Sequence, residues 1–271
     1  MELFTPQKET WFYHVNPAFK FFIIFAALLI TLFNRHFAFA LHLLLIYILL
    51  LVLWSGYSWR KLLLLLAPFV LIFISTASTM ILFGKGEVIW WTWGIIKISE
   101  ESFFRGLLLS MKTVSFGVMG LLFVLTTKPL LFFYALMQQF HLPAKYGYSF
   151  IAAIRLLPTV WEEFHTRTNA LTIRGVRYKA GIQGIYERIR LYAVPLLAQS
   201  IRRAQRIAVA MEAKQFHISS SRTYYYATSY SRRDAVLLIT LVVLLIFAYV
   251  SAQYIPLFEW EPPVHQAVIL Q

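Results

Sequence analysis

Hydrophobic residues occur in five long runs along this chain, and short polar segments separate the runs. They cover residues 18–34, 37–54, 61–83, 103–126 and 234–255. A helix needs about 20 mostly apolar residues to cross the hydrocarbon core of a bilayer, with a range of roughly 17 to 25. Four or five of the runs qualify, because the first is short and begins beside Lys20, whose stem can snorkel to the interface. The pattern predicts an all-α integral membrane protein with about five transmembrane helices.

Two other apolar segments fit the membrane interface better than a crossing. Residues 84–102 contain Trp90, Trp91 and Trp93, which is typical of an interfacial aromatic belt. Residues 129–140 are apolar but short, and they carry Gln138 and Gln139. We therefore favour an interfacial helix there over a sixth crossing.

The region between the fourth and fifth runs is not continuously apolar but has apolar positions at regular intervals. In residues 145–174 and 186–214 apolar positions recur at helical spacing among polar ones, which predicts two long amphipathic helices. Each would reach about 45 Å if continuous. Pro158 and Pro195 are expected to kink these helices or to end a first piece of each. The glycine-containing linker 175–184 suits a reversal of the chain.

Composition and charge support the membrane assignment and orient the chain. Hydrophobic residues make up 59%, charged residues 14%, and mean hydropathy is +0.66. Residues 142–233 hold fifteen lysines and arginines against four acids, so most of the net charge of +13 lies there. Because lysine and arginine are retained on the cytoplasmic side, this region is predicted to be cytoplasmic. The N-terminus is then inside and the C-terminus outside, and no removable signal peptide is expected at the start.

Three regions follow from this topology. Residues 1–127 carry transmembrane helices one to four behind a cytoplasmic N-terminus. Residues 128–233 form a cytoplasmic or interfacial domain built on the two long amphipathic helices. Residues 234–271 contain the last transmembrane helix and an external tail.

The two amphipathic helices end in similar sequences. The first closes with Ala170-Leu171-Thr172-Ile173-Arg174-Gly175 and the second with Ala210-Met211-Glu212-Ala213-Lys214-Gln215. A cation in the last turn favours the negative end of the helix dipole, and a glycine after it can adopt the left-handed conformation that ends a helix. Ordinary helix-ending cations would give the same pattern. Two similar tips on one chain nevertheless suggest a partner with two similar sockets.

The sequence offers little for catalysis. It has no glycine-rich phosphate loop ending in Gly-Lys-Ser/Thr, no cysteine, and no pair of histidines four residues apart. We therefore expect no catalytic residue, no metal site and no cofactor of the chain's own. Lys112 is a charge near the centre of the fourth run, where it faces the bundle interior, faces a partner subunit, or snorkels to the interface.

At this point the residues carry a family resemblance. The run Ile154–Glu163, the segment 170–175 and the segment 202–216 resemble the transmembrane coupling (T) subunit of energy-coupling factor importers of vitamins and metals. Further matches in the same order are Asn16-Pro17 with Lys20, residues 126–129 and residues 135–143. The resemblance covers residues 14 to 250.

The resemblance implies a mechanism and a set of partners. In that family two ATP-binding-cassette ATPase subunits bind the ATP and each accepts one helix tip, and a small membrane substrate-binding (S) subunit carries the vitamin, precursor or metal ion. The complex lies in the prokaryotic cell membrane. Ile173, Arg174 and Gly175 occupy the first docking motif, and Ala213, Lys214 and Gln215 occupy the second. The second departs from the family pattern, which has arginine and glycine where this chain has Lys214 and Gln215, so an asymmetric ATPase pair is an open alternative.

Two other functional hypotheses have weaker support from the sequence. A membrane-anchored scaffold could bind anionic lipid or RNA through residues 174–233, which include Tyr224-Tyr225-Tyr226 and Arg232-Arg233. The rule that retains positive charge inside already accounts for most of that charge, so we expect no nucleic-acid partner. A channel or transporter working alone is disfavoured because few spans carry paired polar groups.

Overall fold

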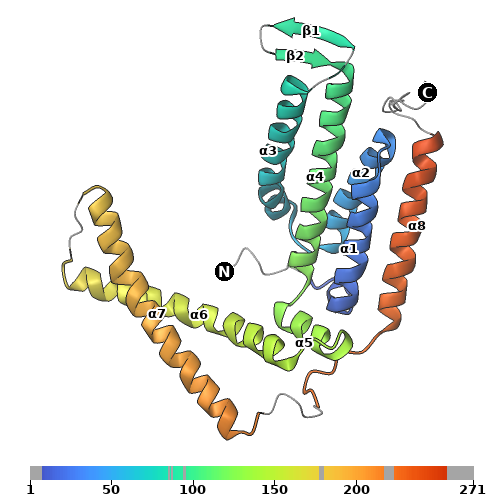
Figure 1. Cartoon of the computed structure of the whole chain (residues 1–271). Coiled ribbons are helices and arrows are strands. Elements are labelled where there is room, and N and C mark those ends of the chain that lie inside the picture. Colours follow the sequence, from blue (N-terminus) through green and yellow to red (C-terminus); the bar gives the residue numbers. More distant parts are fainter. Residues whose placement is uncertain are drawn as a thin grey trace, which may run out of the picture. The chain divides into compact units, whose positions relative to one another are not determined.

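The computed structural model describes residues 8–84, 86, 88–93, 96–176, 180–216 and 223–254 (Figure 1). Its elements follow in chain order: a 3-10 helix Trp11–His14, α1 Pro17–Phe33, α2 Phe37–Trp54, α3 Trp59–Phe83, β1 Ile89–Trp93, β2 Ile96–Ser99, α4 Glu100–Thr126, α5 Pro129–Gln139, α6 Ala144–Ile173, α7 Ile182–Ala213 and α8 Arg232–Tyr254. The protein is an all-α membrane protein, as predicted. The chain forms two compact units, one made of Met1–Lys128 with Ser229–Gln271 and the other of Pro129–Thr228.

Five apolar helices build the first unit. Within the described residues, α2, α3, α4 and α8 are long and apolar enough to cross a membrane, and α1 is a shorter apolar helix of 17 residues. Helix α4 packs against α1, α2 and α3, and α8 packs against α2 and α1. Small residues of α4 permit this closeness: a Cβ on Gly117 would lie 2.2 Å from the ring of Phe69 on α3. The exposed apolar sides of α3 and α8 suit contact with lipid or with another membrane subunit.

A buried polar cluster joins three helices at one end of this unit. Lys20 of α1 is fully buried, and its Nζ donates to the carbonyl of Thr126 at the end of α4 at 3.0 Å. The side chain of Asn16 caps the start of α1, and the backbone N–H of Asn16 donates to Asp234 of α8 at 2.9 Å. Lys20 therefore does not snorkel as the sequence suggested, because the unpaired carbonyl at the end of α4 offers its ammonium a nearer partner.

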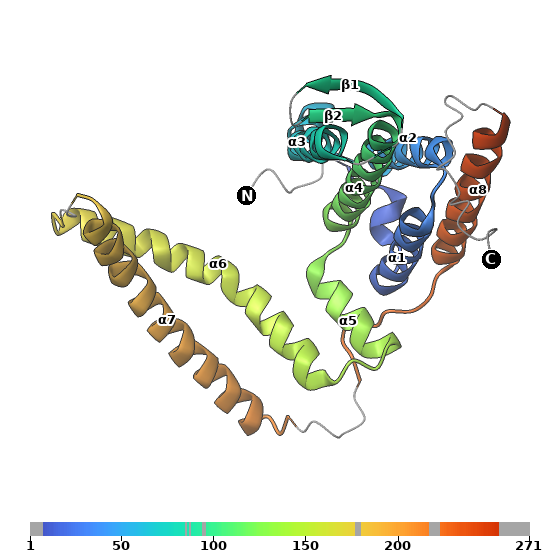
Figure 2. The same ribbon diagram turned by 45° about the horizontal axis from the view of Figure 1, so that its top comes forward.

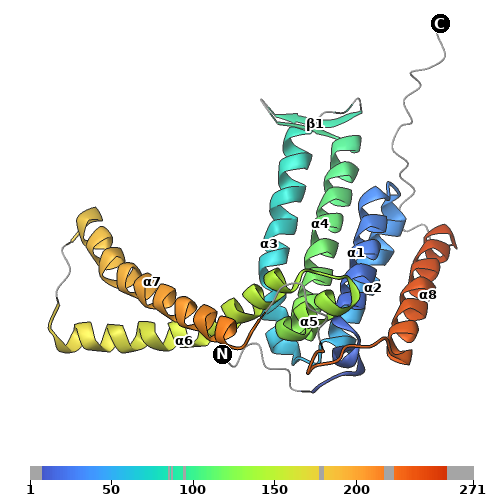
Figure 3. The same cartoon turned by 60° about the horizontal axis from the view of Figure 1, so that its bottom comes forward.

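The opposite end of the unit carries a feature that the sequence pattern did not indicate. Strands β1 and β2 pair antiparallel, and the hairpin lies across the ends of α3 and α4 (Figure 3). The tryptophan-rich segment expected to form an aromatic belt is the first strand of this hairpin. Ser99 and Ser102 then form a capping box that starts α4.

The second unit consists of α5, α6 and α7. Helix α5 has eleven residues, about 16 Å, which is too short to cross a bilayer. It packs on α6 through the stacked rings of Phe133 and Phe150, and Gly147 lets Met137 approach the α6 backbone. The side chain of Gln138 donates to the carbonyl of Tyr226 at 2.7 Å and accepts from the N–H of Thr228 at 2.9 Å, so α5 also holds the returning chain.

Helices α6 and α7 are long, as predicted, but their prolines do not end them. Pro158 lies inside the 30-residue α6 and Pro195 inside the 32-residue α7. Of the two expected outcomes, the end of a first helical piece is therefore wrong at both prolines, and the kink stays a prediction. Because a proline lacks an N–H, it leaves one carbonyl in each helix without its ordinary donor.

Candidate functional site

Helices α6 and α7 pack as a pair whose ribbons cross in Figure 1 and diverge toward the start of α6 and the end of α7 in Figure 2. One side-chain cluster ties them together. Glu163 of α6 forms an ion pair with Arg203 of α7, and its Oε1 also accepts from Gln199 at 3.1 Å. The side chains of Glu163 and Arg203 are only 16% and 23% exposed, so water screens this pair less than a surface pair.

A second contact depends on the proline of α7. Pro195 has no N–H to give to the carbonyl of Leu191 four residues earlier. Arg167 of α6 donates from Nε to that carbonyl at 2.7 Å. Phe164 packs against Tyr192 beside it, with ring centroids 5.2 Å apart. The proline thus creates an acceptor on α7 that an arginine of α6 uses, and we call this contact together with the Glu163–Arg203 pair the brace.

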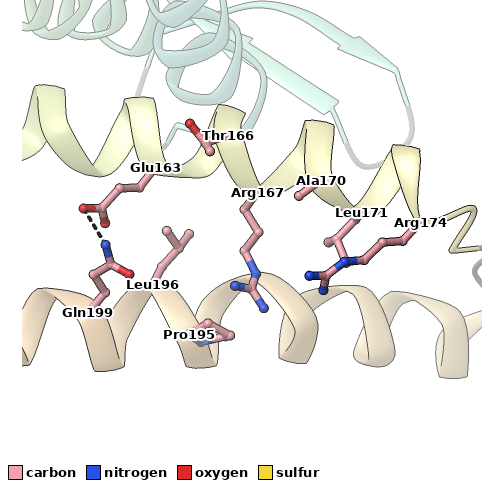
Figure 4. A pocket seen from close by; sticks show the side chains of 9 residues that line it. All are labelled: Glu163, Thr166, Arg167, Ala170, Leu171, Arg174, Pro195, Leu196 and Gln199. Atoms are coloured by element: carbon pink, nitrogen blue, oxygen red, sulfur yellow. Dashed lines mark hydrogen bonds between the residues drawn. The ribbon is translucent and has the colours of Figure 1, made fainter.

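The brace borders a cleft of about 300 Å³ between the two helices. Figure 4 shows Arg167 and Arg174 extending from α6 toward α7, with Glu163 and Gln199 bonded at the other end of the cleft. The lining residues are Glu163, Thr166, Arg167, Ala170, Leu171, Arg174, Pro195, Leu196 and Gln199. Arg174, a predicted site residue, therefore lies at the mouth of a cleft that begins at the brace.

The first tip ends in a complete two-bond helix cap. Gly175 has φ +66°, and its N–H donates to the carbonyl of Thr172 at 3.0 Å. The N–H of Val176 donates to the carbonyl of Leu171 at 3.2 Å. These two bonds define the Schellman motif, which satisfies the last carbonyls of a helix. Ile173 is 86% exposed and Arg174 is exposed beside it, so the cap presents one apolar side chain and one cation.

The second tip repeats this cap bond for bond. Gln215 has φ +55°, and its N–H donates to the carbonyl of Glu212 at 2.8 Å. The N–H of Phe216 donates to the carbonyl of Met211 at 3.0 Å. Lys214 thus occupies the position of Arg174, and exposed Ala213 occupies that of Ile173. A non-glycine residue in the left-handed region costs about 1–2 kcal/mol, so the neighbours of Gln215 must hold it there.

Phe216 supplies that support. Its ring packs edge-on against Tyr148 of α6, with centroids 5.3 Å apart. At the first tip Val176 stands in the position of Phe216, and Leu171, the counterpart of Met211, is buried at 7% exposed. The internal similarity of the two sequences is now explained: Ala170 and Ala210 accept the N–H of the cation's residue, and Leu171 and Met211 accept the second cap bond.

Both tips stand at the same sequence distance from the brace. Arg174 follows Glu163 by eleven residues, and Lys214 follows Arg203 by eleven residues. At 1.5 Å per residue each cation lies about 16 Å beyond the ion pair along its own helix. Within the described residues neither Arg174 nor Lys214 takes part in an ion pair, so both cations are available to a partner.

Lys112, the remaining predicted site residue, belongs to the other unit. Its Nζ donates to the carbonyl of Leu32, near the end of α1, at 2.9 Å. That carbonyl is among the last four of α1, which have no partner within the helix. Lys112 therefore contacts a helix end inside its own unit.

The residues of the brace were not among those predicted from the sequence. The available signal was Pro195, which frees the carbonyl of Leu191, but a single sequence does not show which arginine of α6 reaches it. The tyrosines considered for nucleic-acid binding have a structural contact as well: Tyr226 packs against Tyr134 with centroids 5.5 Å apart, and its carbonyl accepts from Gln138.

Comparison with known proteins agrees with this arrangement. The CbiQ family, described as cobalt transport protein, matches residues 8–225. The energy-coupling factor transporter transmembrane protein EcfT of Streptococcus equi subsp. equi is 31% identical over 216 residues, which cover 76% of this chain and 80% of that protein. The EcfT of Brevibacillus brevis is 26% identical over 247 residues, 88% of this chain and 92% of that protein.

The EcfT of Limosilactobacillus fermentum is also similar, with 26% identity over 196 residues that cover 69% of this chain and 73% of that protein. The family match spans most of the transmembrane helices together with α5, α6 and α7. This chain therefore belongs to the CbiQ/EcfT family and is a non-catalytic transmembrane (T) component of an energy-coupling factor transporter.

Proposed function

We propose that α6 and α7 carry motion from two ATP-binding-cassette ATPase subunits to a small substrate-binding membrane subunit. The Ile173-Arg174-Gly175 tip docks in one ATPase and the Ala213-Lys214-Gln215 tip docks in the other. ATP is bound by those partners. The complex imports a vitamin, a vitamin precursor or a metal ion across the prokaryotic cell membrane.

The observation that carries this proposal is the pair of matched helix caps on one brace. Each cap projects an exposed cation from a backbone fixed by two hydrogen bonds. The Glu163–Arg203 ion pair joins the two helices at equal sequence distance from both cations. Such a pair of arms suits two similar sockets that move together, because displacement of one arm is passed to the other through the ion pair.

The distribution of charge supports a cytoplasmic position for these arms. Residues 142–233 carry fifteen lysines and arginines against four acids, and cations of this kind are retained on the cytoplasmic side. The N-terminus lies on the same side in this proposal. ATPases that bind cytoplasmic ATP can then reach both tips.

Exposed apolar side chains support a membrane partner. Several large ones lie along α6 and α7, including Trp161 at 58%, Leu197 at 61% and Ile201 at 58% exposed. Apolar surface of this extent on two otherwise polar helices favours burial against another protein or against lipid. A substrate-binding subunit bound to this apolar surface would be displaced when α6 and α7 move.

The test is an affinity purification of the full-length chain from its host, followed by mass spectrometry and an ATPase assay. Wild type should retain two ATPases and a small membrane protein. Arg174→Ala and Lys214→Ala should each weaken ATPase retention, and the double variant should abolish it, because acceptor groups of the ATPase then lose their cationic donors. Arg206→Ala, an exposed charge of α7 before the tip, is the matched control and should retain both ATPases.

The alternative scaffold gives a different result. Binding to RNA or anionic lipid through phosphates weakens steeply with salt and is insensitive to a single tip substitution. If the ATPases are still retained after nuclease treatment and in 0.5 M salt, the result would support the proposed role in coupling ATPases to transport. Absence of any ATPase from the wild-type eluate would overturn it.

A further inference from the structure

Lys112 and the turn between α1 and α2 form a cationic site beside apolar surface. The turn consists of Asn34, Arg35 and His36, and the side chain of Asn34 locks it by accepting from the N–H of His36 at 2.9 Å and donating to its carbonyl at 3.0 Å. Arg35 is exposed at the apex of this fixed turn. The carbonyl of Leu32, which accepts from Lys112 at 2.9 Å, lies three residues before Arg35, so the two cations belong to the same end of the bundle.

No acid compensates these two cations within the described residues. The ion pairs found there involve Glu9 and Glu163 and neither Arg35 nor Lys112. Lys112 donates one bond to the Leu32 carbonyl, and an ammonium has three donors. Two adjacent cations that share no counter-ion favour an anion between them.

The level of the site in the bundle limits which anion can occupy it. Helices α1 and α2 have 17 and 18 residues, about 26 Å, whereas α3 and α4 have 25 and 27 residues, about 38–40 Å. Figure 1 shows α3 and α4 extending past the α1–α2 turn toward the hairpin. Measured from Thr126, Lys112 stands about 21 Å along α4. It therefore lies short of the far boundary of a hydrocarbon core about 30 Å thick.

The neighbouring side chains are apolar and exposed. Phe33 is 78%, Leu32 49% and Ile30 44% exposed at the end of α1. A ligand that satisfies both features has an anionic group for the cations and a hydrocarbon chain for the apolar side chains. A free inorganic anion has only the first.

We propose that Arg35 and Lys112 bind the phosphate of a membrane phospholipid in the leaflet at the hairpin end. Because α1 and α2 are short, their connecting turn draws the headgroup a few ångströms below its usual plane. This displacement costs only fractions of a kcal/mol per ångström. In the orientation proposed above, which this inference uses only to name the leaflet, it is the outer one. The bound lipid neutralises the two cations and fills the step between the α1–α2 turn and the taller α3–α4 pair.

The test measures phosphatidylglycerol bound to the delipidated full-length chain by native mass spectrometry. Arg35→Gln and Lys112→Gln should each lower lipid affinity about fivefold, the effect of one basic side chain near an anionic lipid. Arg60→Gln, an exposed cation at the opposite end of α3, is the control for loss of charge and should bind as wild type does. Within the described residues the side chain of Arg35 makes no hydrogen bond or ion pair, so its variant tests the site even if Lys112→Gln disturbs the end of α1.

A reporter locates the lipid. Because the chain has no cysteine, Phe33→Cys can carry a single fluorophore, and phosphatidylglycerol with a nitroxide at its headgroup should quench it in wild type and less in Arg35→Gln. Equal quenching in all variants would overturn the site. Displacement of the lipid by millimolar inorganic phosphate would also overturn it, because the occupant would then be a free anion. ATPase retention in the same variants tests the proposed function separately and should stay unchanged.

Discussion

The two tips use the same backbone cap with different residues. Both have a left-handed residue after the cation and the same two cap bonds, although one left-handed residue is Gly175 and the other is Gln215. Glycine adopts this conformation freely, whereas glutamine adopts it only when its surroundings compensate the cost. The comparison teaches that a docking tip is defined by its hydrogen bonds and by its anchor in the adjacent helix. The identity of the capping residue is secondary.

The largest expected effect comes from breaking the Glu163–Arg203 ion pair, which both tips share. Arg203→Ala should loosen both tips, because it removes the ion pair that joins α6 to α7 and leaves the largely buried Glu163 carboxylate with only the neutral Gln199 as its partner, at a cost of about 2 kcal/mol. Hydrogen exchange of the 168–176 and 208–216 peptides should rise together. Arg202→Ala, its exposed neighbour, should change neither. A response confined to the second tip would show that the brace does not join them.

A smaller effect is expected from the contact that Pro195 creates. Arg167→Leu should destabilise the α6–α7 pair by about 1.5 kcal/mol, because the Leu191 carbonyl loses its donor. In a Pro195→Ala background the new alanine N–H can reach that carbonyl, so the same substitution should cost much less. Thermal unfolding of the four proteins gives the coupling energy. Equal costs in both backgrounds would rule out the proposed role of the proline.

The tips should respond with opposite signs to changes at the capping residue. Gly175→Ala should loosen the first tip by about 1 kcal/mol, because no atom crowds the new Cβ and only the backbone conformation is strained. Gln215→Gly should tighten the second tip by a similar amount. Amide exchange at residues 175–176 and 215–216, read as roughly fivefold changes, measures both. The same sign at both tips would mean that the two caps differ in solution.

The smallest effect should come from giving both tips the same cation, arginine or lysine. Lys214→Arg keeps the charge and adds a planar fork, so ATPase retention should change by only about twofold if the second socket reads charge alone. Arg174→Lys should reduce retention more if the first socket binds the guanidinium through two bonds. Quantitative pull-down of both variants compares the sockets. Equal responses would indicate two equivalent ATPases.

The membrane bundle follows from the sequence because lipid imposes a simple rule. A spanning segment needs length and apolarity, and residues 37–54, 61–83 and 103–126 show both without reference to any contact. The hairpin was not predicted because Ile89–Trp93 is apolar on both faces and so lacks the alternation that marks a half-buried strand. Lys20 was placed wrongly because its acceptor, the carbonyl of Thr126, lies 106 residues away.

The candidate site was predictable in its exposed parts and not in its buried ones. The cations and Gly175 follow from local rules for helix ends. The Glu163–Arg203 pair depends on how two helices pack, and their separation of 40 residues leaves no local signal. The left-handed Gln215 was equally hidden, because its support comes from Phe216 against Tyr148 on another helix.

The polar cluster of Asn16, Lys20 and Asp234 also has a consequence for biosynthesis. Asn16 meets its partner Asp234 only after 218 further residues have been made. At about 5–20 residues per second, the first helix waits roughly 10–40 s for that partner. Lys20 waits about half as long for Thr126. Helix α1 therefore enters the bilayer before Lys20 and the backbone N–H of Asn16 have these partners, and α8 completes the polar cluster around the start of α1.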